Sequence, residues 1–371
     1  MSLRHALVLP GSVIALFFGA SVFAGCGASG SSPVDDTDAG GPGDTSPDAG
    51  SRGPGKPAGS DGGGTLPGTD SGGGPKTDGA TPGDGSTVSG LGTIFTIVME
   101  NHDYNEIVGS PDAPYFNSLI ADYGLATSYQ DSGTHPSLPN YLTMISGAAQ
   151  YPGILDVEPT NTLAGFPKMA ENLGTQLQAG NVPWRAYAED MGTPCALASA
   201  GPYATKHVPF FYFKDMQTGT PGLCAKTNVD YAANFATDLA AGTYKYMWIT
   251  PNLTNDGHDP VNGLGTATDP VASLKASDAW AKVEIAKIMA SPAYTNGGVI
   301  FLTWDEGEGR GSPPNKDQVP MIIISTRIVS KGFKSNKPYT HKSYLATVED
   351  ILKLPRLGTV SSEATMMEFF K

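Results

Sequence analysis

The strongest constraint on this chain is a change of composition near residue 90. The segment before it consists mainly of Gly, Ser, Pro, Thr and Asp, with almost no large apolar side chains. Such a segment buries too little apolar surface to offset the entropy lost on folding, so we expect residues 26–90 to form a disordered tether. We therefore expect the fold in residues 91–371, a length suited to one large domain.

Residues 1–25 have the pattern of a secretory signal. Basic residues in MSLRH precede a long apolar run, and small residues come just before Cys26 in FAGC. Small residues followed by cysteine resemble a bacterial lipobox. We therefore expect a lipid on Cys26 to anchor the exported protein to a membrane of the cell envelope, facing the periplasm or the cell surface. A plain signal peptide and an uncleaved membrane anchor are the alternatives.

The chain is acidic, with a formal net charge of −13. Residues 27–90 alone carry nine Asp against three basic residues, a net charge of −6. Nearly half of the negative charge therefore belongs to the tether and says little about the partner of the folded part. The acidic balance argues against a nucleic acid partner, which needs a basic surface.

Two cysteines, Cys195 and Cys224, fall in the folded part. An oxidising compartment favours a disulfide between them, and two buried thiols are the alternative. The bridge would close a loop of about thirty residues and stabilise the fold by roughly 3 kcal/mol. We expect this loop to shape the substrate pocket. A separate expectation is that the protein is a monomer.

Strand-like and helix-like patterns alternate along the folded part. Several of the strand-like runs are continuously apolar, which is typical of strands covered on both faces; the runs are 93–99, 183–189, 244–252, 297–306 and 319–325. Helical spacing is found in APYFNSLIADYG, PSLPNYLTMISG, LAGFPKMAENLGTQLQAG, DPVASLKASDAWAKVEIAKIMAS and KSYLATVEDILKL. This alternation predicts an α/β fold with a mostly parallel central sheet flanked by helices.

Polar side chains follow three of the predicted strands. The three clusters are Glu100 and Asn101, then Asn252, Asn255, Asp256, His258 and Asp259, then Asp305 and Glu306. Because sites in open α/β sheets form at the carboxyl ends of strands, we expect these clusters to converge. Oxygen ligands of this kind suit a hard cation, so the clusters predict a metal site. For any one cluster alone, a turn or helix cap is the alternative.

The histidines of the folded part also lie beside predicted strand ends or helix starts. They are His102, His135, His207, His258 and His341. Together they suggest groups held around an anion, or further metal ligands. For each of them taken singly, a structural role is the alternative.

Ser137 stands between two prolines in THPSLPNY, at the start of a predicted helix. Pro139 is tolerated in the first turn of a helix, and the N-terminus of a helix favours a bound phosphate. A rigid backbone and a neighbouring cation would make Ser137 a nucleophile, and Asn140 one turn on would donate to a phosphoryl oxygen. A helix-capping role for Ser137 is the alternative.

Six segments, in this order, resemble the bacterial and fungal phosphoesterase family: IVMENHDYNEIVG, THPSLPNYLTMISG, YATKHVPFFYF, NLTNDGHD, TWDEGEG and YTHKSYLATVEDIL. This family comprises acid phosphatases and phosphatidylinositol-phosphate phosphatases. It is related to bacterial phospholipases C and belongs to the alkaline phosphatase superfamily. The resemblance runs from Thr93 to Leu354 and implies the three-layer fold of that superfamily and a hydrolase of phosphoric esters.

Carried over by motif, the resemblance implies one principal divalent metal ion of unknown identity. Its implied ligands are Glu100, Asn101, Asp305 and Glu306. Ser137 is the implied nucleophile. The groups implied to bind the phosphoryl group or protonate the leaving oxygen are His207, His258 and Asp256, and weaker candidates for substrate binding are His135 and His341.

The expected reaction is hydrolysis of a phosphate monoester in two steps, through a phosphoserine at Ser137, with release of inorganic phosphate. One alternative is a phospholipase C-like enzyme that cleaves phosphodiesters. Another is a surface lipoprotein that binds its ligand without catalysis. The sequence leaves the substrate open among sugar phosphates, nucleotides and phosphoinositide headgroups.

Overall fold

The computed structural model describes residues 90–148, 156–160, 171–258, 270–308 and 317–371. The predicted signal peptide, Cys26, nearly all of the predicted tether and Asp259 lie outside these ranges. Within them, no helix is both long enough and apolar enough to cross a membrane.

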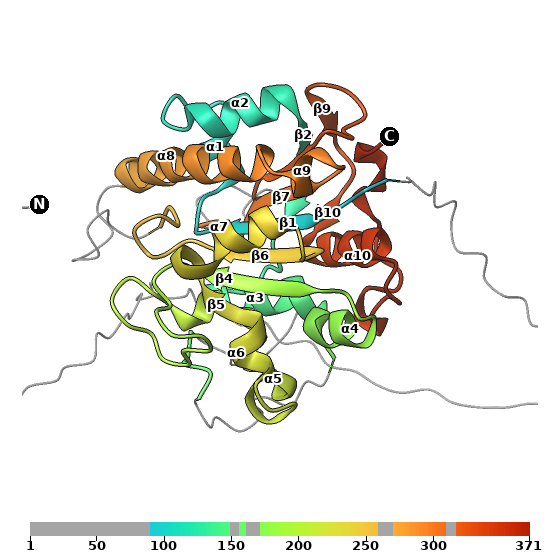
Figure 1. The fold of residues 1–371 in the computed structure, drawn as a ribbon. Helices are drawn as coiled ribbons and strands as arrows, with labels where there is room; N and C mark the ends of the chain where they lie inside the picture. The colour runs from blue at the N-terminus through green and yellow to red at the C-terminus, as the bar shows by residue number, and fades with distance from the viewer. Residues whose placement is uncertain (1–89, 149–155, 161–170, 259–269, 309–316) are drawn as a thin grey trace, which may run out of the picture. The chain divides into compact units, whose positions relative to one another are not determined.

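An eight-stranded sheet lies at the centre of the described fold, in the order β5-β4-β6-β1-β7-β8-β2-β9 (Figure 1). Its strands are β1 Ile94–Met99, β2 Gly124–Ala126, β4 Trp184–Ala188, β5 Asn228–Asp230, β6 Tyr246–Thr250, β7 Val299–Trp304, β8 Met321–Ser325 and β9 Phe333–Ser335. Neighbouring strands are parallel except where β8 pairs with β7 and β2. A small parallel sheet pairs β3 Tyr129–Gln130 with β10 Tyr339–Thr340. The predicted mostly parallel sheet is confirmed.

The predicted strand-like runs correspond to β1, β4, β6, β7 and β8. Every residue of β1, β6, β7 and β8 is buried, as their continuous apolar character indicates. The remaining strands have only two or three residues each, which is too short for a recognisable pattern. The reversed direction of β8 was not predicted, because an apolar run carries no information on strand direction.

Helices pack in two groups. In the first, α2 Pro114–Asp122 packs on α8 Pro270–Met289, which contacts α9 Pro292–Thr295, and α9 contacts α7 Tyr231–Ala241. In the second, α3 Ser137–Ser146 packs on α10 His341–Leu352 and contacts α4 Leu173–Ala179. Shorter helices are α1 Tyr104–Ile107, α5 Lys214–Thr218, α6 Leu223–Thr227, η1 Thr205–His207, η2 Pro209–Tyr212, η3 Gly358–Val360 and η4 Met366–Phe369. Helix α7 was not predicted, and the predicted helix of residues 163–180 is described only from Leu173.

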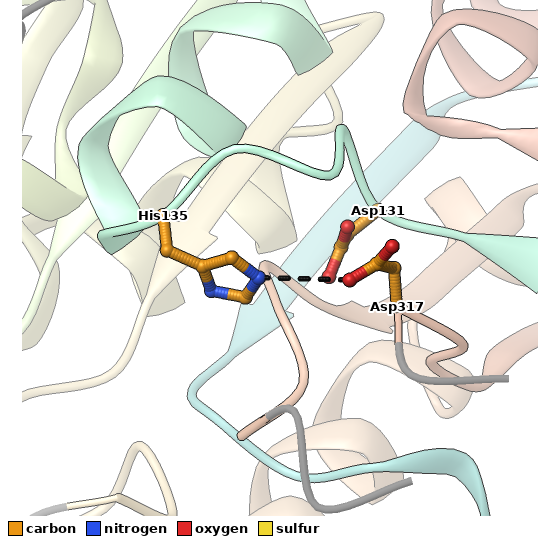
Figure 2. A group of neighbouring side chains, drawn as sticks. All are labelled: Asp131, His135 and Asp317. Carbon is orange, nitrogen blue, oxygen red and sulfur yellow. Dashed lines mark ion pairs between the residues drawn. The ribbon is translucent and has the colours of Figure 1, made fainter. Parts of the chain in front are cut away.

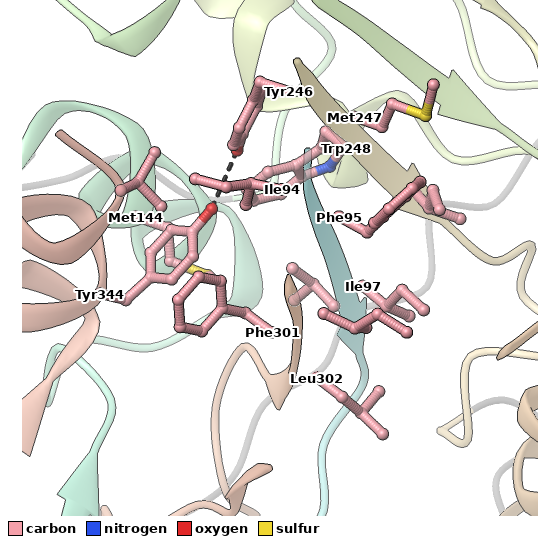
Figure 3. Packing of buried hydrophobic residues seen from close by; sticks show 14 of the residues in the cluster. Ile94, Phe95, Ile97, Met144, Tyr246, Met247, Trp248, Phe301, Leu302 and Tyr344 are labelled. Atoms are coloured by element: carbon pink, nitrogen blue, oxygen red, sulfur yellow. Dashed lines mark hydrogen bonds between the residues drawn. The ribbon is translucent and has the colours of Figure 1, made fainter. Parts of the chain in front are cut away.

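Aromatic and aliphatic side chains join the central strands to α3 and α10 (Figure 3). The Phe301 ring of β7 lies edge-on to the ring of Tyr344 in α10, with 5.5 Å between the ring centroids. The buried Tyr344 hydroxyl lies 2.9 Å from the Tyr246 hydroxyl and 2.7 Å from Oγ1 of Thr96. These hydroxyl groups satisfy one another inside the core, so α10 is fixed against β1 and β6. That fixes the position of the first residue of α10, His341.

Cys195 and Cys224 form the predicted disulfide, with 5.4 Å between their Cα atoms. The bridge joins the loop after β4 to helix α6 and closes a loop that contains η1. Two side chains described below, Lys206 and His207, belong to η1. The disulfide therefore restrains the segment that carries these two residues.

Candidate active site

Ser137 is the first residue of α3 and is buried. Its Oγ donates to Oε2 of Glu100 at 2.9 Å and lies 3.3 Å from Oε1 of Glu306. The N-cap residue of the helix is Pro136, which precedes Ser137 and makes no side-chain cap hydrogen bond. The alternative of a simple capping serine is therefore wrong, because the hydroxyl faces two carboxylates rather than the helix backbone.

Glu100 directly follows β1 and is fully buried. Its Oε1 accepts a hydrogen bond of 2.5 Å from the Tyr141 hydroxyl, and its backbone N–H donates to the Asp256 carbonyl at 2.9 Å. The second bond links the end of β1 to the loop after β6, so two of the predicted polar clusters do meet. Burial raises the pKa of Glu100 well above its usual value; Lys206 opposes this shift and Asp256 adds to it.

Asp305 directly follows β7 and is also fully buried. Within the described ranges, neither of its carboxylate oxygens has a hydrogen-bond partner. Burial raises the pKa of Asp305 well above its usual value, and the nearby charges of Glu100 and Glu306 raise it further. A buried carboxylate without a partner is costly, so this position calls for a cation.

The amides predicted at the site both hold Glu306. Asn101 Nδ2 donates to its Oε1 at 3.2 Å, and Asn140 Nδ2 donates to its Oε2 at 3.0 Å. Asn140 Nδ2 also donates to the Thr134 carbonyl at 2.9 Å, so both of its amide hydrogens are engaged. In this geometry Asn140 positions Glu306 and offers no free hydrogen to a phosphoryl oxygen.

The backbone at Asn101 is turned sharply. Its φ of 25° lies in the left-handed region, which is uncommon for a residue with a side chain. Its Oδ1 is buried and has no hydrogen-bond partner in the described part of the chain. The strained turn therefore presents an amide oxygen of ligand type beside Glu100 and Glu306.

His207 is buried against the site and His258 is at its edge. The His207 ring stacks on Tyr141, with 5.2 Å between centroids, and its Nε2 lies 3.1 Å from Oε1 of Glu100 without a hydrogen bond. Burial lowers the pKa of His207 well below its usual value, so its imidazole is neutral at pH 7. The His258 side chain is 30% exposed, its Nε2 is 3.4 Å from Oε1 of Glu308, and its backbone N–H donates to Asp256 Oδ1 at 3.0 Å.

His341 lies beneath the site. Its Nε2 donates to the Asp305 carbonyl at 2.5 Å, and its Nδ1 accepts from the Tyr129 hydroxyl at 2.9 Å. Burial lowers its pKa to about 4, which keeps the ring neutral. The geometry does not support the predicted substrate contact, because both ring nitrogens are engaged; His341 instead positions the backbone of Asp305. His102 is likewise buried, with Nε2 2.9 Å from the Gly257 carbonyl.

A second group of carboxylates lies beside the first. Figure 2 shows Asp131, His135 and Asp317, one ligand-type atom of each lying within 4.8 Å of the others. His135 Nε2 is 3.8 Å from Asp317 Oδ1, and His135 Nδ1 is 2.6 Å from Oε2 of Glu306. That pair with Glu306 raises the pKa of His135 to about 9, and burial raises the pKa of Asp131 to about 7. We refer to Asp131, His135 and Asp317 as the His135 cluster.

Several site residues were missed by the sequence reasoning. Tyr141 lies one helical turn after Ser137, a spacing that places it on the same face of α3. Lys206 precedes His207 and feels the charges of Glu100 and Asp305. Asp131 and Asp317 are brought together by backbone pairing, since the Asp131 N–H donates to the Asp317 carbonyl at 2.9 Å. Only Tyr141 and Lys206 could have been found from the sequence, because each lies close in sequence to a predicted site residue.

The residues present suit a hard divalent cation at the end of β1 and β7. Two carboxylates, Glu100 and Asp305, are fully buried with raised pKa values, and the Glu306 residue is only 3% exposed. The unpartnered oxygens of Asp305 and Asn101 are the donor type that such ions prefer. The predicted ligand set therefore fits a metal ion on the chemistry of its donors.

The sequence profile of the phosphoesterase family matches residues 110–355. The chain belongs to this family. It is accordingly a hydrolase that acts on phosphoric esters, and the resemblance inferred from six motifs is confirmed.

Two relatives agree with this membership, and a solved structure shares the fold. A phosphatidylinositol-3-phosphatase of Mycobacterium tuberculosis is 29% identical over 284 residues, which cover 76% of this chain and 84% of that protein. A probable acid phosphatase of Kluyveromyces lactis is 27% identical over 286 residues, or 74% of this chain but only 61% of that longer protein. A protein in the alkaline phosphatase superfamily from Vibrio parahaemolyticus superposes with a TM-score of 0.52 at 13% identity, over 74% of this chain and 69% of that one. The structural likeness confirms the predicted fold.

Proposed function

We propose that this phosphoesterase is a metal-dependent phosphomonoesterase whose nucleophile is Ser137. The observation that supports the proposal best is the position of Ser137 Oγ. It lies at the N-terminus of α3, 2.9 Å from Glu100 Oε2 and 3.3 Å from Glu306 Oε1. A helix N-terminus favours a bound phosphate, and the names of the two relatives are those of phosphatases. These points favour a monoester over a diester as substrate.

One divalent cation would be held by Glu100, Asn101, Asp305 and Glu306. When bound it would supply positive charge and Lewis acidity beside the reacting phosphoryl group. Its identity is left to experiment, because the donors are oxygens that calcium, zinc and iron all accept.

The remaining chemistry belongs to the side chains of the site. Ser137 Oγ attacks phosphorus in line, and the ester oxygen leaves as an alcohol. Glu100 Oε2 accepts the hydrogen bond of the serine hydroxyl, so it orients the oxygen and takes the proton as the bond to phosphorus forms. His258, which reaches solvent, protonates the leaving oxygen, and the neutral His207 contacts the phosphoryl group. Water then attacks the phosphoserine and gives a proton to His258, while Ser137 recovers its proton from Glu100 and inorganic phosphate is released.

The proposal is tested by hydrolysis of p-nitrophenyl phosphate and bis(p-nitrophenyl) phosphate. Wild type is compared with Ser137→Ala and with Ser118→Ala, an exposed serine of α2, with chelator and after restoring each divalent metal. We expect monoester hydrolysis that chelator removes, that Ser137→Ala abolishes and that Ser118→Ala leaves unchanged. A preference for the diester would indicate the phospholipase C-like alternative. No hydrolysis with any metal would indicate a binding lipoprotein.

We also propose that the protein is an exported lipoprotein anchored through Cys26. The proposal is supported by the sequence before Cys26 and by the Cys195–Cys224 disulfide, which suits an oxidising compartment. Labelled palmitate should enter the wild-type chain but not Cys26→Ser, and the variant should leave the membrane fraction. A Cys26→Ser chain that stays in the membrane would instead indicate an uncleaved anchor.

A further inference from the structure

One carboxylate bridges the nucleophile helix to a lysine. Oδ1 of Asp156 accepts a hydrogen bond of 3.0 Å from the backbone N–H of Leu138, the residue directly after Ser137. Its Oδ2 accepts one of 2.6 Å from Nζ of Lys206. The two oxygens of a single anion are thus bound by a main-chain N–H at the start of α3 and by an ammonium group.

This is the arrangement with which proteins bind oxygens of a phosphoryl group. Helix N-terminal N–H groups and a lysine both favour a bound oxyanion, and a carboxylate resembles two of the three free oxygens of a phosphomonoester. The site is also in the right place. Leu138 adjoins Ser137, and Lys206 adjoins His207, whose Nε2 lies 3.1 Å from Glu100.

Two further observations connect Lys206 to the reacting centre. Burial lowers the pKa of Lys206, but Glu100, Asp156 and Asp305 outweigh this effect and raise it, so its ammonium is charged. Beside it, the fully buried Asp305 carboxylate has no hydrogen-bond partner in the described ranges. An unpartnered buried carboxylate therefore lies close enough to Lys206 for the two charges to interact.

The bridge is suited to being exchanged. The side chains of Asp156 and Lys206 are 26% and 27% exposed, so both reach solvent and their ion pair is partly screened. The chain around Asp156 is held independently, because Tyr212 donates to the Val157 carbonyl at 2.6 Å and Thr205 to Oε2 of Glu158 at 2.5 Å. Asp156 can therefore release its partners while the backbone beside it stays in place.

We propose that the Leu138 N–H and Lys206 Nζ form a phosphoryl-oxygen subsite, that Asp156 fills it in the free enzyme, and that the substrate phosphate displaces Asp156. The inference deepens the proposed function and rests on it. A dianionic phosphomonoester competes for Lys206 better than a singly charged diester does. Lys206 is therefore a specificity residue for monoesters, and Asp156 is an internal competitor whose removal strengthens phosphate binding.

The deciding measurement is the Kd of inorganic phosphate, measured by calorimetry on the full-length, metal-loaded chain. Lys206→Met should raise this Kd by about 10–100-fold, because a charged donor is lost. Asp156→Asn should lower it by about 3–10-fold, because the competing anion is lost. Lys206→Arg, which keeps the charge, should stay within about threefold of wild type. In kinetics, Lys206→Met should raise KM for p-nitrophenyl phosphate more than KM for bis(p-nitrophenyl) phosphate.

A matched control is available in another surface ion pair. Lys275 Nζ lies 3.1 Å from Asp112 Oδ1, and neither residue contacts the site. Lys275→Met and Asp112→Asn remove the same charges and should leave the Kd of phosphate unchanged. Thermal unfolding of every variant identifies losses that come from misfolding, and in that case Lys206→Gln replaces Lys206→Met.

The opposite signs predicted for the two variants make the proposal easy to overturn. If Asp156→Asn weakens phosphate binding as Lys206→Met does, Asp156 merely holds the lysine and is no competitor. If the wild type is active and neither variant changes the Kd, the subsite is wrong while the proposed function stands. If the wild type neither hydrolyses an ester nor binds phosphate, the proposed function itself fails and this inference fails with it.

Discussion

Two groups of carboxylates lie side by side in this protein, and their negative charges are stabilised in different ways. At the ends of β1 and β7, Glu100 and Asp305 are fully buried, and Asp305 has no hydrogen-bond partner in the described part of the chain. In the His135 cluster, Asp131 is buried too, yet its carboxylate accepts hydrogen bonds from the N–H groups of Gly133 at 2.7 Å and Gly307 at 3.2 Å. Asp131 is therefore satisfied by hydrogen bonds from the protein, whereas Asp305 is not within the described ranges.

The histidines explain the difference. His135 pairs with Glu306, which raises its pKa to about 9, so it is a cation at neutral pH and balances the carboxylates around it. The pKa of His207, beside Glu100, shifts in the opposite direction, because burial lowers it well below the usual value and leaves the ring neutral. Lys206 is a cation near the first group, but the Asp305 carboxylate still has no hydrogen-bond partner in the described part of the chain, so that group has the greater need of a metal ion. We therefore propose that the divalent ion of the proposed mechanism binds at Glu100 and Asp305, although among the described residues the group with the spacing of a metal site is the His135 cluster.

The largest effect is expected from removal of the nucleophile. Ser137→Ala should lower kcat for p-nitrophenyl phosphate by about 10⁴-fold or more, since both steps pass through this oxygen. Metal content and unfolding free energy should change little, because the predicted ligands remain. A Ser137→Ala enzyme with near wild-type kcat would show that some other group attacks phosphorus and that Ser137 is not the nucleophile.

The next largest effect is expected for Asp305→Asn, which should lose activity but gain stability. Asp305→Asn should lower activity about 100-fold or more and reduce metal binding, because a buried charged ligand is lost. In chelator at pH 7 the same variant should be more stable than wild type by about 1–3 kcal/mol, because a costly buried carboxylate is gone.

The sign of that stability gain follows from the raised pKa of Asp305. Its cost is absent at acidic pH, where the carboxyl is protonated in both the folded and unfolded states. It appears as pH rises above the usual carboxyl pKa, because only the unfolded state then loses its proton freely. Urea unfolding of the metal-free proteins at about pH 3 and pH 7 should show the gain at pH 7 only. A variant that is less stable at both pH values would mean that Asp305 has a partner in the absence of metal.

The first group was largely predictable from the sequence and the second was not. Glu100 and Asp305 follow continuous apolar runs, and the carboxyl ends of parallel strands share one edge of a sheet, so local pattern was sufficient to bring them together. Ser137 was recognisable because proline marks the first turn of its helix. Asp131 and Asp317 meet through an isolated bridge between Gln130 and Gln318, a long-range pairing that leaves no periodic signal.

Roles were harder to predict than positions. Asn140 and His341 were expected to face substrate, and the structure places both close to the reacting centre. Asn140 instead donates to Glu306 and Thr134, and His341 donates to the backbone carbonyl of Asp305. Sequence spacing does not reveal such partners. Asp156 was not noticed at all, because its contacts cross to Leu138 and Lys206, which are far from it in the chain.

A smaller effect tests whether His135 is the internal cation. Its raised pKa stabilises the fold fully below pH 6.5, the usual histidine value, and this contribution is lost as pH rises toward 9. Because the ring is 37% exposed, solvent screening reduces the contribution to about 1 kcal/mol. In chelator, the wild type should therefore lose about that much stability between pH 6.5 and pH 9, and His135→Asn should lose less over the same interval. Equal slopes for the two proteins would show that His135 is not the charge that balances its cluster.

The smallest effect is expected at the other end of the same cluster. Asp317→Asn, like Asp305→Asn, removes an aspartate carboxylate, and Asp317 belongs to the trio that has the spacing of a metal site. If the metal ion binds at Glu100 and Asp305, metal content and kcat/KM of Asp317→Asn should stay within about threefold of wild type, because only a partly exposed charge is lost. Metal content is measured by elemental analysis after dialysis, with Asp305→Asn as the depleted reference. If Asp317→Asn loses as much bound metal as Asp305→Asn does, the metal ion binds at the His135 cluster instead. His135 would then be a ligand of that ion and not a cation that takes its place.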